Sequence, residues 1–193
     1  MELMTAIENR RSIRRFKKDP IPRGAIEAIL DAARLAPSGK NLQPWQFIVV
    51  QGNAHKEMCA CLDKALENRK AEGMTSVGSA AHTFNTMKQA PVTVFLFSRR
   101  DSFFTGERSL FDEVSKIVDT QSIGAAIEHM LLKATELGLG SLWICDTFYA
   151  YGELCAWLQK DALLIAAVTL GMADEAPEAR PRRTLERLVE WRD

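Results

Sequence analysis

The sequence predicts an α+β fold in which helices pack around a modest sheet. Four short runs are rich in β-branched and aromatic residues, which is typical of buried strands. Segments with apolar residues at helical spacing outnumber these runs, and long helical segments separate the strands, which favours layers of helices against a sheet. The length of 193 residues predicts a single domain, residues 1–193.

Residues 1–69 contain three predicted helices and the first strand. Residues 2–10 place apolar side chains at helical spacing. Pro22 opens the second helix, because a first helical turn tolerates the fixed φ and missing N–H of proline, and Pro37 ends it. The run Trp45–Val50 is rich in aromatic and β-branched residues and predicts a strand. Residues 54–69 have one apolar side and predict the third helix.

The C-terminal half contains the longest predicted helix, residues 112–137. Its apolar residues occupy more than one stripe, so we expect it in the middle of the molecule or at a subunit contact. Residues 73–79 read as a linker of small residues, and residues 185–189 as a final amphipathic piece. The other predicted elements are helices at residues 80–89 and 149–159 and strands at residues 91–97, 141–145 and 163–170.

The composition is that of a globular protein and excludes several classes. Hydrophobic residues make up 47% of the chain, and 25 Lys and Arg balance 25 Asp and Glu. Burial of this much apolar surface can offset the conformational entropy lost on folding, which excludes a disordered chain. The chain also has no net charge to attract nucleic acid or an anionic membrane. No apolar run approaches the roughly 20 residues that span a bilayer, and residues 1–12 lack the order of a signal peptide. We therefore expect a cytoplasmic protein with neither membrane nor nucleic acid as a partner.

Metal and nucleotide motifs are missing from the sequence. Cys59 and Cys61 fall in a helical pattern, whereas Cys145 and Cys155 lie far away with no local histidine, so the spacing of a zinc site is absent. We expect no metal. The glycine patterns of a Rossmann dinucleotide site and of a P-loop are absent as well.

The densest chemical signal is the run Arg10–Lys18, which holds six basic side chains in nine residues. Taken alone, such a run is most often a solvated charged turn, and a nucleic-acid patch is another interpretation. Ser12, Ile13 and Phe16 interrupt the run, so we expect some of its residues to face inward. Arginines beside a hydroxyl and free backbone N–H groups suit one phosphomonoester better than a polyanion.

Three further segments carry candidate site residues. A basic cluster near the C-terminus could converge with the first run on one dianionic group. The loop of residues 37–45 lies between two prolines; it reads as a helix-to-strand connector or as the edge of a site for a planar heterocycle. Residues 138–147 read as a buried strand and turn, or as backbone that points at a ligand. The candidate residues in these segments are Arg180, Arg182 and Arg183, then Pro37, Ser38 and Asn41, and then Cys145 and Asp146.

These motifs occur in the order found in a known family. A helix is followed by Arg10–Phe16, RRSIRRF, and the loop Ala36–Trp45 reads APSGKNLQPW. A strand begins at Ala90-Pro91, the long helix runs into Leu137–Gly140, LGLG, and a basic element precedes Leu185-Glu186. With these motifs the chain resembles the FMN-dependent nitroreductase family over nearly its whole length.

The resemblance implies a nitroreductase-like fold with a central, mostly antiparallel sheet of four to five strands surrounded by helices. It also implies a homodimer with a long central helix and shared flavin sites. Residues 70–112 would include a substrate-pocket excursion, and residues 174–193 would form a tail that packs on the partner subunit. The pair Cys145-Asp146 departs from the family, many of whose members have small residues there, often Gly-Gly.

The resemblance assigns a role to each candidate residue. The FMN phosphate would be held by Arg10, Ser12 and Arg182, with Arg11, Arg180 and Arg183 nearby. Arg14 would approach the N1/O2 edge of the flavin ring, and the backbone of Cys145 and Asp146 would address its N5 side. Pro37, Ser38 and Asn41 would come from the second subunit.

By the same resemblance, FMN carries the redox chemistry and no side chain acts as an acid or base. NADH or NADPH would reduce the flavin and leave, and a nitroaromatic, quinone or related small acceptor would take its place in a ping-pong sequence. The alternatives are an enone or alkene reductase, a flavin reductase, and a flavin-binding protein without turnover.

Overall fold

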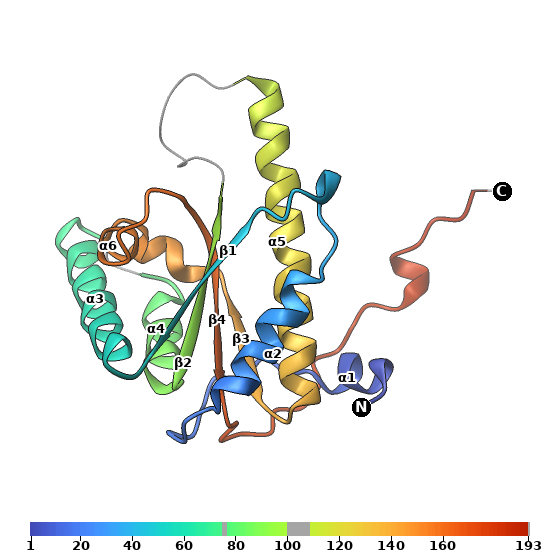
Figure 1. The fold of residues 1–193 in the computed structure, drawn as a ribbon, viewed down its shortest axis with the longest axis horizontal. Helices are drawn as coiled ribbons and strands as arrows, with labels where there is room; N and C mark the ends of the chain where they lie inside the picture. Colours follow the sequence, from blue (N-terminus) through green and yellow to red (C-terminus); the bar gives the residue numbers. More distant parts are fainter. Residues whose placement is uncertain (75–76, 100–108, 193) are drawn as a thin grey trace.

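The computed structural model describes residues 1–74, 77–99 and 109–192. Within these residues, two groups of helices cover the opposite faces of one antiparallel sheet, which gives three layers (Figure 1). Its strands follow the order β1-β2-β4-β3, and each coincides with a strand that the sequence predicts. The α+β prediction is therefore confirmed. The strands are β1 (Trp45–Gln51), β2 (Val92–Ser98), β3 (Gly140–Ile144) and β4 (Leu163–Gly171).

The central strands β2 and β4 form the most apolar part of the sheet. Every residue of β2 is buried, because a strand lies on each side of it and helices cover both of its faces. Alternate residues serve opposite layers, as the two-residue period of a strand requires. Val94 and Leu96 belong to one hydrophobic core, and Phe95 and Phe97 belong to the other.

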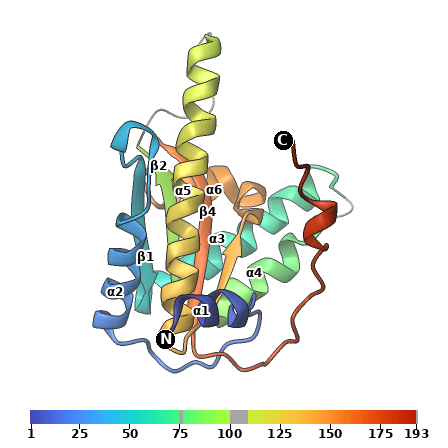
Figure 2. The same cartoon turned by 90° about the vertical axis from the view of Figure 1, so that its right-hand side faces the viewer.

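One helical layer contains α1 (Leu3–Asn9), α2 (Arg23–Arg34) and α5 (Leu110–Glu136). The middle and C-terminal turns of α5 are buried against the sheet and α2, as its several apolar stripes predict. The first turns of α5 project well beyond the sheet (Figure 2). That projecting end starts with a reciprocal capping box between Ser109 and Asp112, which satisfies backbone donors that would otherwise be left free.

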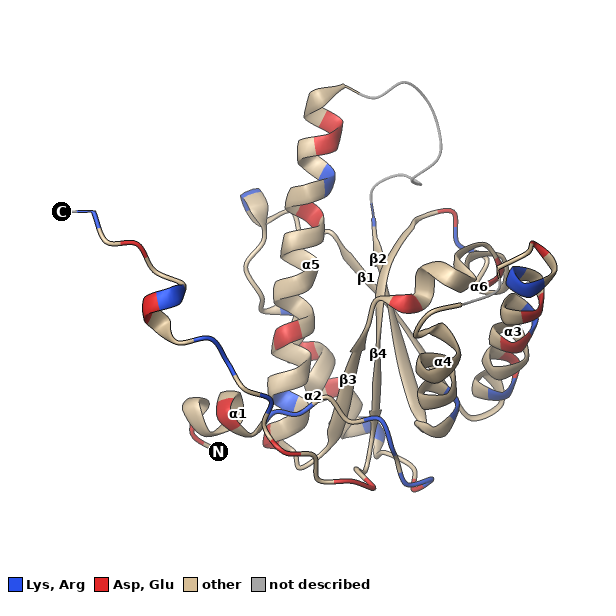
Figure 3. Ribbon diagram, turned by 180° about the vertical axis from the view of Figure 1, so that it is seen from behind, with Lys and Arg blue, Asp and Glu red and all other residues tan. Residues whose placement is uncertain are grey.

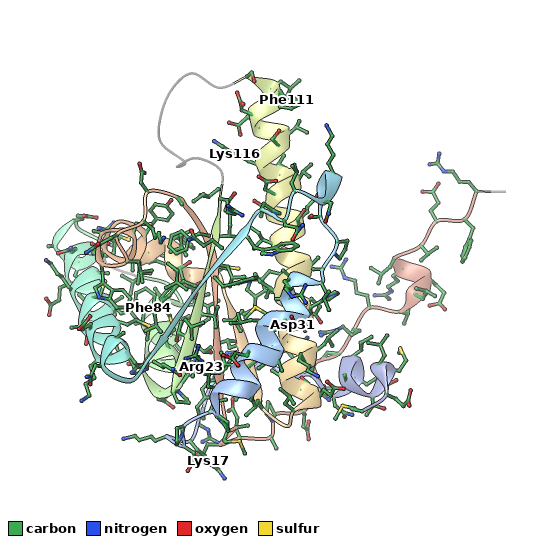
Figure 4. All side chains as sticks on the ribbon, in the orientation of Figure 1. Lys17, Arg23, Asp31, Phe84, Phe111 and Lys116 are labelled. Carbon is green, nitrogen blue, oxygen red and sulfur yellow. The ribbon has the colours of Figure 1, made fainter. Side chains whose placement is uncertain are left out.

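The opposite layer contains α3 (Gly52–Ala71), α4 (Ala80–Gln89) and α6 (Tyr151–Trp157). The apolar side predicted for α3 faces the sheet, and Met58, Leu62 and Ala65 are fully buried there. Phe84 of α4 fills the same core (Figure 4). Among the described residues, no helix is both long and apolar enough to cross a lipid bilayer.

Three predicted segments differ in detail from the structure. The piece predicted at residues 185–189 is a single 3₁₀ turn, Leu185–Arg187, because so short a helix depends on packing and this chain offers it no surface. The helix predicted at residues 149–159 is shorter in the structure, because its first two residues belong to a 3₁₀ turn, Asp146–Ala150, that precedes α6. Within residues 70–112, α4 and β2 belong to the core, whereas residues 75–76 and 100–108 lie outside the described residues.

Candidate functional site

The basic run leaves α1 as an extended segment that crosses the ends of β3 and β4. The N–H of Ile13 donates to the carbonyl of Ser141 at 2.9 Å, and the N–H of Lys17 donates to the carbonyl of Met172 at 2.9 Å. Ile13 and Phe16 are buried, as the interrupted pattern of the run predicts. Because these apolar residues fix the segment to the sheet, the arginines between them stay at the surface.

A glycine in β4 makes this crossing feasible. A Cβ atom at Gly171 would lie 2.8 Å from Cδ1 of Phe16 and 2.8 Å from Cδ of Pro91, which is closer than packed carbon atoms tolerate. Any larger residue would push the basic segment away from the sheet. Gly171 therefore belongs to the support of the site, although it carries no chemistry of its own.

The N-terminal and C-terminal segments together enclose a cavity of about 450 Å³. Figure 3 shows basic residues on the segment that follows α1 and on the C-terminal segment that passes beside α1. The structure thus brings together arginines from both clusters singled out in the sequence, whereas Arg183 is not among the lining residues. The lining residues with candidate roles are Arg10, Arg11, Ser12, Arg14, Arg180 and Arg182.

The cavity is strongly positive. Five arginines and two glutamates, Glu8 and Glu178, line it. Arg10 is steadied by Glu128 of α5, with 3.5 Å between Nε and Oε1, and Arg14 donates from Nη1 to the carbonyl of Ser12 at 3.1 Å. A guanidinium has five N–H donors, so both groups keep donors for a ligand. Clustered charged donors beside a serine suit a phosphate dianion, and the donor set fits the phosphate of FMN.

Strand β3 leads from this cavity to the second candidate segment. Ser12 pairs with Ser141 near the start of β3, and Cys145 follows its end. A strand rises roughly 3.3 Å per residue, which places Ser141 and Cys145 about 13 Å apart. Burial of the thiol raises the pKa of Cys145, and the carboxylate of Asp146 raises it further. The net upward shift of the pKa favours the neutral thiol near pH 7, so Cys145 lacks the lowered pKa of a nucleophilic cysteine.

Asp146 accepts hydrogen bonds from the first turn of α4 and from Ser79, the residue that precedes this helix. Its Oδ2 accepts hydrogen bonds from the hydroxyl of Ser79 at 2.7 Å and from the hydroxyl of Thr83 at 2.6 Å. These bonds tie the turn after β3 to the opposite helical layer. Sequence reasoning missed both hydroxyl residues, and the available signal was their spacing of four residues, which places them on one side of a helix.

The loop that follows α2 lies against α5, and its residues are not among those that line the arginine cavity. The N–H of Gly39 donates to Oγ of Ser122 at 3.3 Å. A Cβ atom at Gly39 would lie 2.5 Å from Cγ1 of Val118, so the loop approaches α5 as closely as only glycine allows. Pro37 and Ser38 therefore lie beside α5 rather than beside the phosphate donors of their own chain.

The same loop is held in a strained conformation. Lys40, Asn41 and Gln43 have φ angles of 53°, 54° and 46°, in the left-handed region that favours glycine. The hydroxyl of Ser38 stabilises the turn by accepting a hydrogen bond from the N–H of Gln43 at 3.0 Å. Strain of this kind persists where the surroundings enforce it, and it clusters at binding sites.

Two histidines lie within hydrogen-bond distance of backbone carbonyl groups. Nε2 of His55 lies 3.2 Å from the carbonyl oxygen of Met87, and Nδ1 of His129 lies 3.1 Å from that of Ala32. Among the residues that the structure describes, no group of three or more His, Cys, Asp or Glu could hold a metal ion.

The fold and the cavity define a three-layer α+β protein with an arginine-lined cavity where its two terminal segments meet. The Nitroreductase family model matches residues 7–172, and the chain belongs to this family of oxidoreductases.

Proteins from other organisms show the same relationship. An NADH dehydrogenase of Thermus thermophilus is 28% identical over 216 residues, covering 100% of this chain and 97% of its own. An iodotyrosine deiodinase of Thermotoga neapolitana is 28% identical over 182 residues, covering 91% of this chain and 90% of its own. The crystal structure of a nitroreductase in complex with FMN from Desulfovibrio desulfuricans superposes with a TM-score of 0.76 at 26% identity, covering 100% of this chain and 98% of that one.

Proposed function

We propose that this protein is an FMN-dependent oxidoreductase that takes electrons from NADH or NADPH and delivers them to a small acceptor such as a nitroaromatic or a quinone. The observation that carries the proposal is the arginine cavity, because five guanidinium groups from both ends of the chain provide a place for the FMN phosphate. Membership of the nitroreductase family and likeness to an FMN-bound relative support it.

The residues around the cavity act by binding and orienting. Arg10, Ser12 and Arg182 bind the phosphate through charge-assisted hydrogen bonds. Arg14 places a positive charge at the N1/O2 edge of the ring, and the backbone that follows β3 at Cys145 and Asp146 orients the N5 side. When bound, FMN supplies the hydride and electron transfer, so the proposal requires no side chain as an acid or base.

We also propose that a second copy of the chain completes the site. Leu110, Phe111 and Ile117, at the projecting start of α5, are 82%, 70% and 57% exposed, and Phe111 lies at its free tip (Figure 4). The tail at residues 184–192 also exposes its apolar side chains. Contiguous apolar surface of this kind marks an interface. A homodimer covers both surfaces and brings the loop at residues 37–41 of one chain to the flavin of the other.

The purified protein tests this function in two steps. Mass spectrometry of the released ligand should identify FMN, at one molecule per chain, and FAD, haem or no ligand would contradict the proposal. NADH or NADPH oxidation is then measured with nitroarenes, quinones, enones and free flavin, and with an iodotyrosine because one relative is a deiodinase. Parallel double-reciprocal plots are expected for the ping-pong sequence. Bound FMN without turnover would identify a flavin-binding protein instead.

A further inference from the structure

We propose that Glu175 is a positioning residue that sets the distance between the two arginine-bearing walls of the cavity; the inference rests on the proposed FMN site. Glu175 follows β4 in the segment that continues to Arg180 and Arg182, and its side chain is 20% exposed. It was not among the residues singled out from the sequence. Its partners lie at the opposite end of the chain, so no local pattern indicates them.

The carboxylate of Glu175 accepts hydrogen bonds from two successive backbone N–H groups of the basic run. Its Oε1 accepts the N–H of Arg14 and, at 3.2 Å, the N–H of Arg15. Its Oε2 lies 3.5 Å from Nε of Arg15. The N–H of Asp174 also donates to the carbonyl of Arg15 at 2.9 Å. The backbone at Arg14 is therefore held from the C-terminal segment by charge-assisted bonds.

This arrangement couples the two walls of the cavity. One wall carries Arg14, whose guanidinium lines the cavity, and the other carries Arg180 and Arg182. Glu175 lies outside the lining, in the segment that leads into the second wall, and binds the backbone of the first wall. Because a phosphate contacts both walls at once, the distance between them decides how many guanidinium donors reach it.

A carboxylate near a phosphate site should weaken anion binding through its negative charge. Glu175 can favour FMN binding only if its effect on the position of the arginines outweighs this repulsion. Glu175 is not among the residues that line the arginine cavity and instead lines the neighbouring hollow, beside Ile13 and Gly140. Glu178 does line the arginine cavity, whereas the carboxylate that accepts the N–H groups of Arg14 and Arg15 is that of Glu175. Removing the two glutamates should therefore change phosphate affinity in opposite directions.

Flavin binding by the full-length protein, freed of flavin by dialysis, tests the proposal. FMN and riboflavin, which lacks the phosphate, are titrated and followed by flavin fluorescence. Glu175→Ala should weaken FMN binding by about tenfold, the effect of one lost hydrogen bond to a charged group. Riboflavin binding should weaken less, because riboflavin keeps the ring edge that meets Arg14 but lacks the phosphate that contacts both walls. Glu175→Gln should keep most of the FMN affinity, because its amide oxygen still accepts backbone N–H bonds. Glu178→Ala, the matched loss of charge, should bind FMN more tightly.

The outcomes separate this inference from the proposed function. If the unmodified protein binds FMN no better than riboflavin, the phosphate site itself is wrong. If it prefers FMN and Glu175→Ala binds FMN as tightly as before, or more tightly, Glu175 acts by charge alone and the inference is overturned. Equal losses for FMN and riboflavin also overturn it. Should Glu175→Ala not fold, Glu175→Asp serves instead, since it keeps the charge but is too short to reach both donors. The same larger loss for FMN than for riboflavin is expected.

Discussion

At the scale of single residues, the chemistry of the site depends on donors that the fold leaves partly free. Arg10 and Arg182 come from opposite ends of the chain and line one cavity. Arg10 is paired with a glutamate of α5 through one nitrogen, and its other donors remain for a ligand. Binding strength at such a site follows the number of charged hydrogen bonds that form at once.

Replacement of either arginine should loosen FMN without unfolding the protein. A hydrogen bond to a charged group contributes about 1.5–3 kcal/mol, so Arg182→Ala and Arg10→Ala should each weaken FMN binding by roughly ten- to a hundredfold. Isothermal titration calorimetry measures the change. Arg23→Ala is the control, because Arg23 is exposed on α2 and pairs with Glu27. Unchanged FMN affinity in both cavity variants would show that the phosphate lies elsewhere.

Cys145 should be dispensable for turnover. Its pKa is raised by burial and by Asp146, so the fraction of thiolate near neutral pH is small, and the proposed role of Cys145 is a main-chain contact with the flavin. Cys145→Ala should retain most NAD(P)H-dependent reduction of a quinone or nitroarene. Alkylation of Cys145 by iodoacetamide should be slow at pH 8 and accelerate only as the pH rises further. Lost turnover in a variant that still binds flavin would instead assign the thiol a chemical role.

At the scale of elements, the structure joins each part of the site to the sheet by close contacts. The basic segment reaches β3 and β4 only because Gly171 has no side chain, and the turn after β3 is bonded to α4 through Asp146. The loop after α2 contacts α5 at Gly39, through a hydrogen bond to Ser122 and a close approach to Val118. Small residues at these crossings therefore determine where the functional loops lie.

Gly39→Ala should displace the loop and destabilise the protein. The added Cβ would overlap with Cγ1 of Val118, and overpacking of this kind costs about 1–3 kcal/mol. Urea unfolding measures the loss. The double variant Gly39→Ala with Val118→Ala removes the opposing methyl groups and should recover part of the stability lost in the single variant. A loss that is identical in the single and double variants would show that the contact with Val118 is not its cause.

At the scale of the whole molecule, two extremities of the single chain expose large apolar side chains. The start of α5 projects beyond the sheet, and the C-terminal segment runs away from the three layers (Figures 1 and 2). Trp191 on that segment is 81% exposed. An exposed tryptophan forgoes the free energy that burial of its apolar surface would contribute. The tail would therefore be stabilised by a surface that covers it, and the described residues of this chain leave it uncovered.

A homodimer is the expected form in solution, and FMN should bind only to it. Sedimentation at low micromolar concentration should find a dimer, and the unfolding midpoint should rise with protein concentration. Free FMN at 100 times its dissociation constant should add ~2.7 kcal/mol per site to the stability of the protein. Phe111→Ser combined with Ile117→Ser removes exposed apolar surface from α5 and should weaken both association and FMN binding. A monomer that holds FMN as tightly as the dimer would refute the shared site.

The sequence by itself determined the elements and the family. The strands at β1, β2, β3 and β4 and the long helix α5 were predicted to within about two residues, because hydrophobic periodicity is a local property of the chain. The motifs RRSIRRF and APSGKNLQPW likewise identify the family without any coordinates, since each lies within ten consecutive residues.

Only the tertiary structure decided which side chains share a site. It placed Arg10 with Arg182 in one cavity, left Arg183 outside its lining, and bonded Glu175 to the backbone of Arg14. It also gave Asp146 two hydroxyl donors, Ser79 just before α4 and Thr83 within it. These pairings join residues far apart in the chain, and they form only when the layers pack and their buried polar groups must find partners.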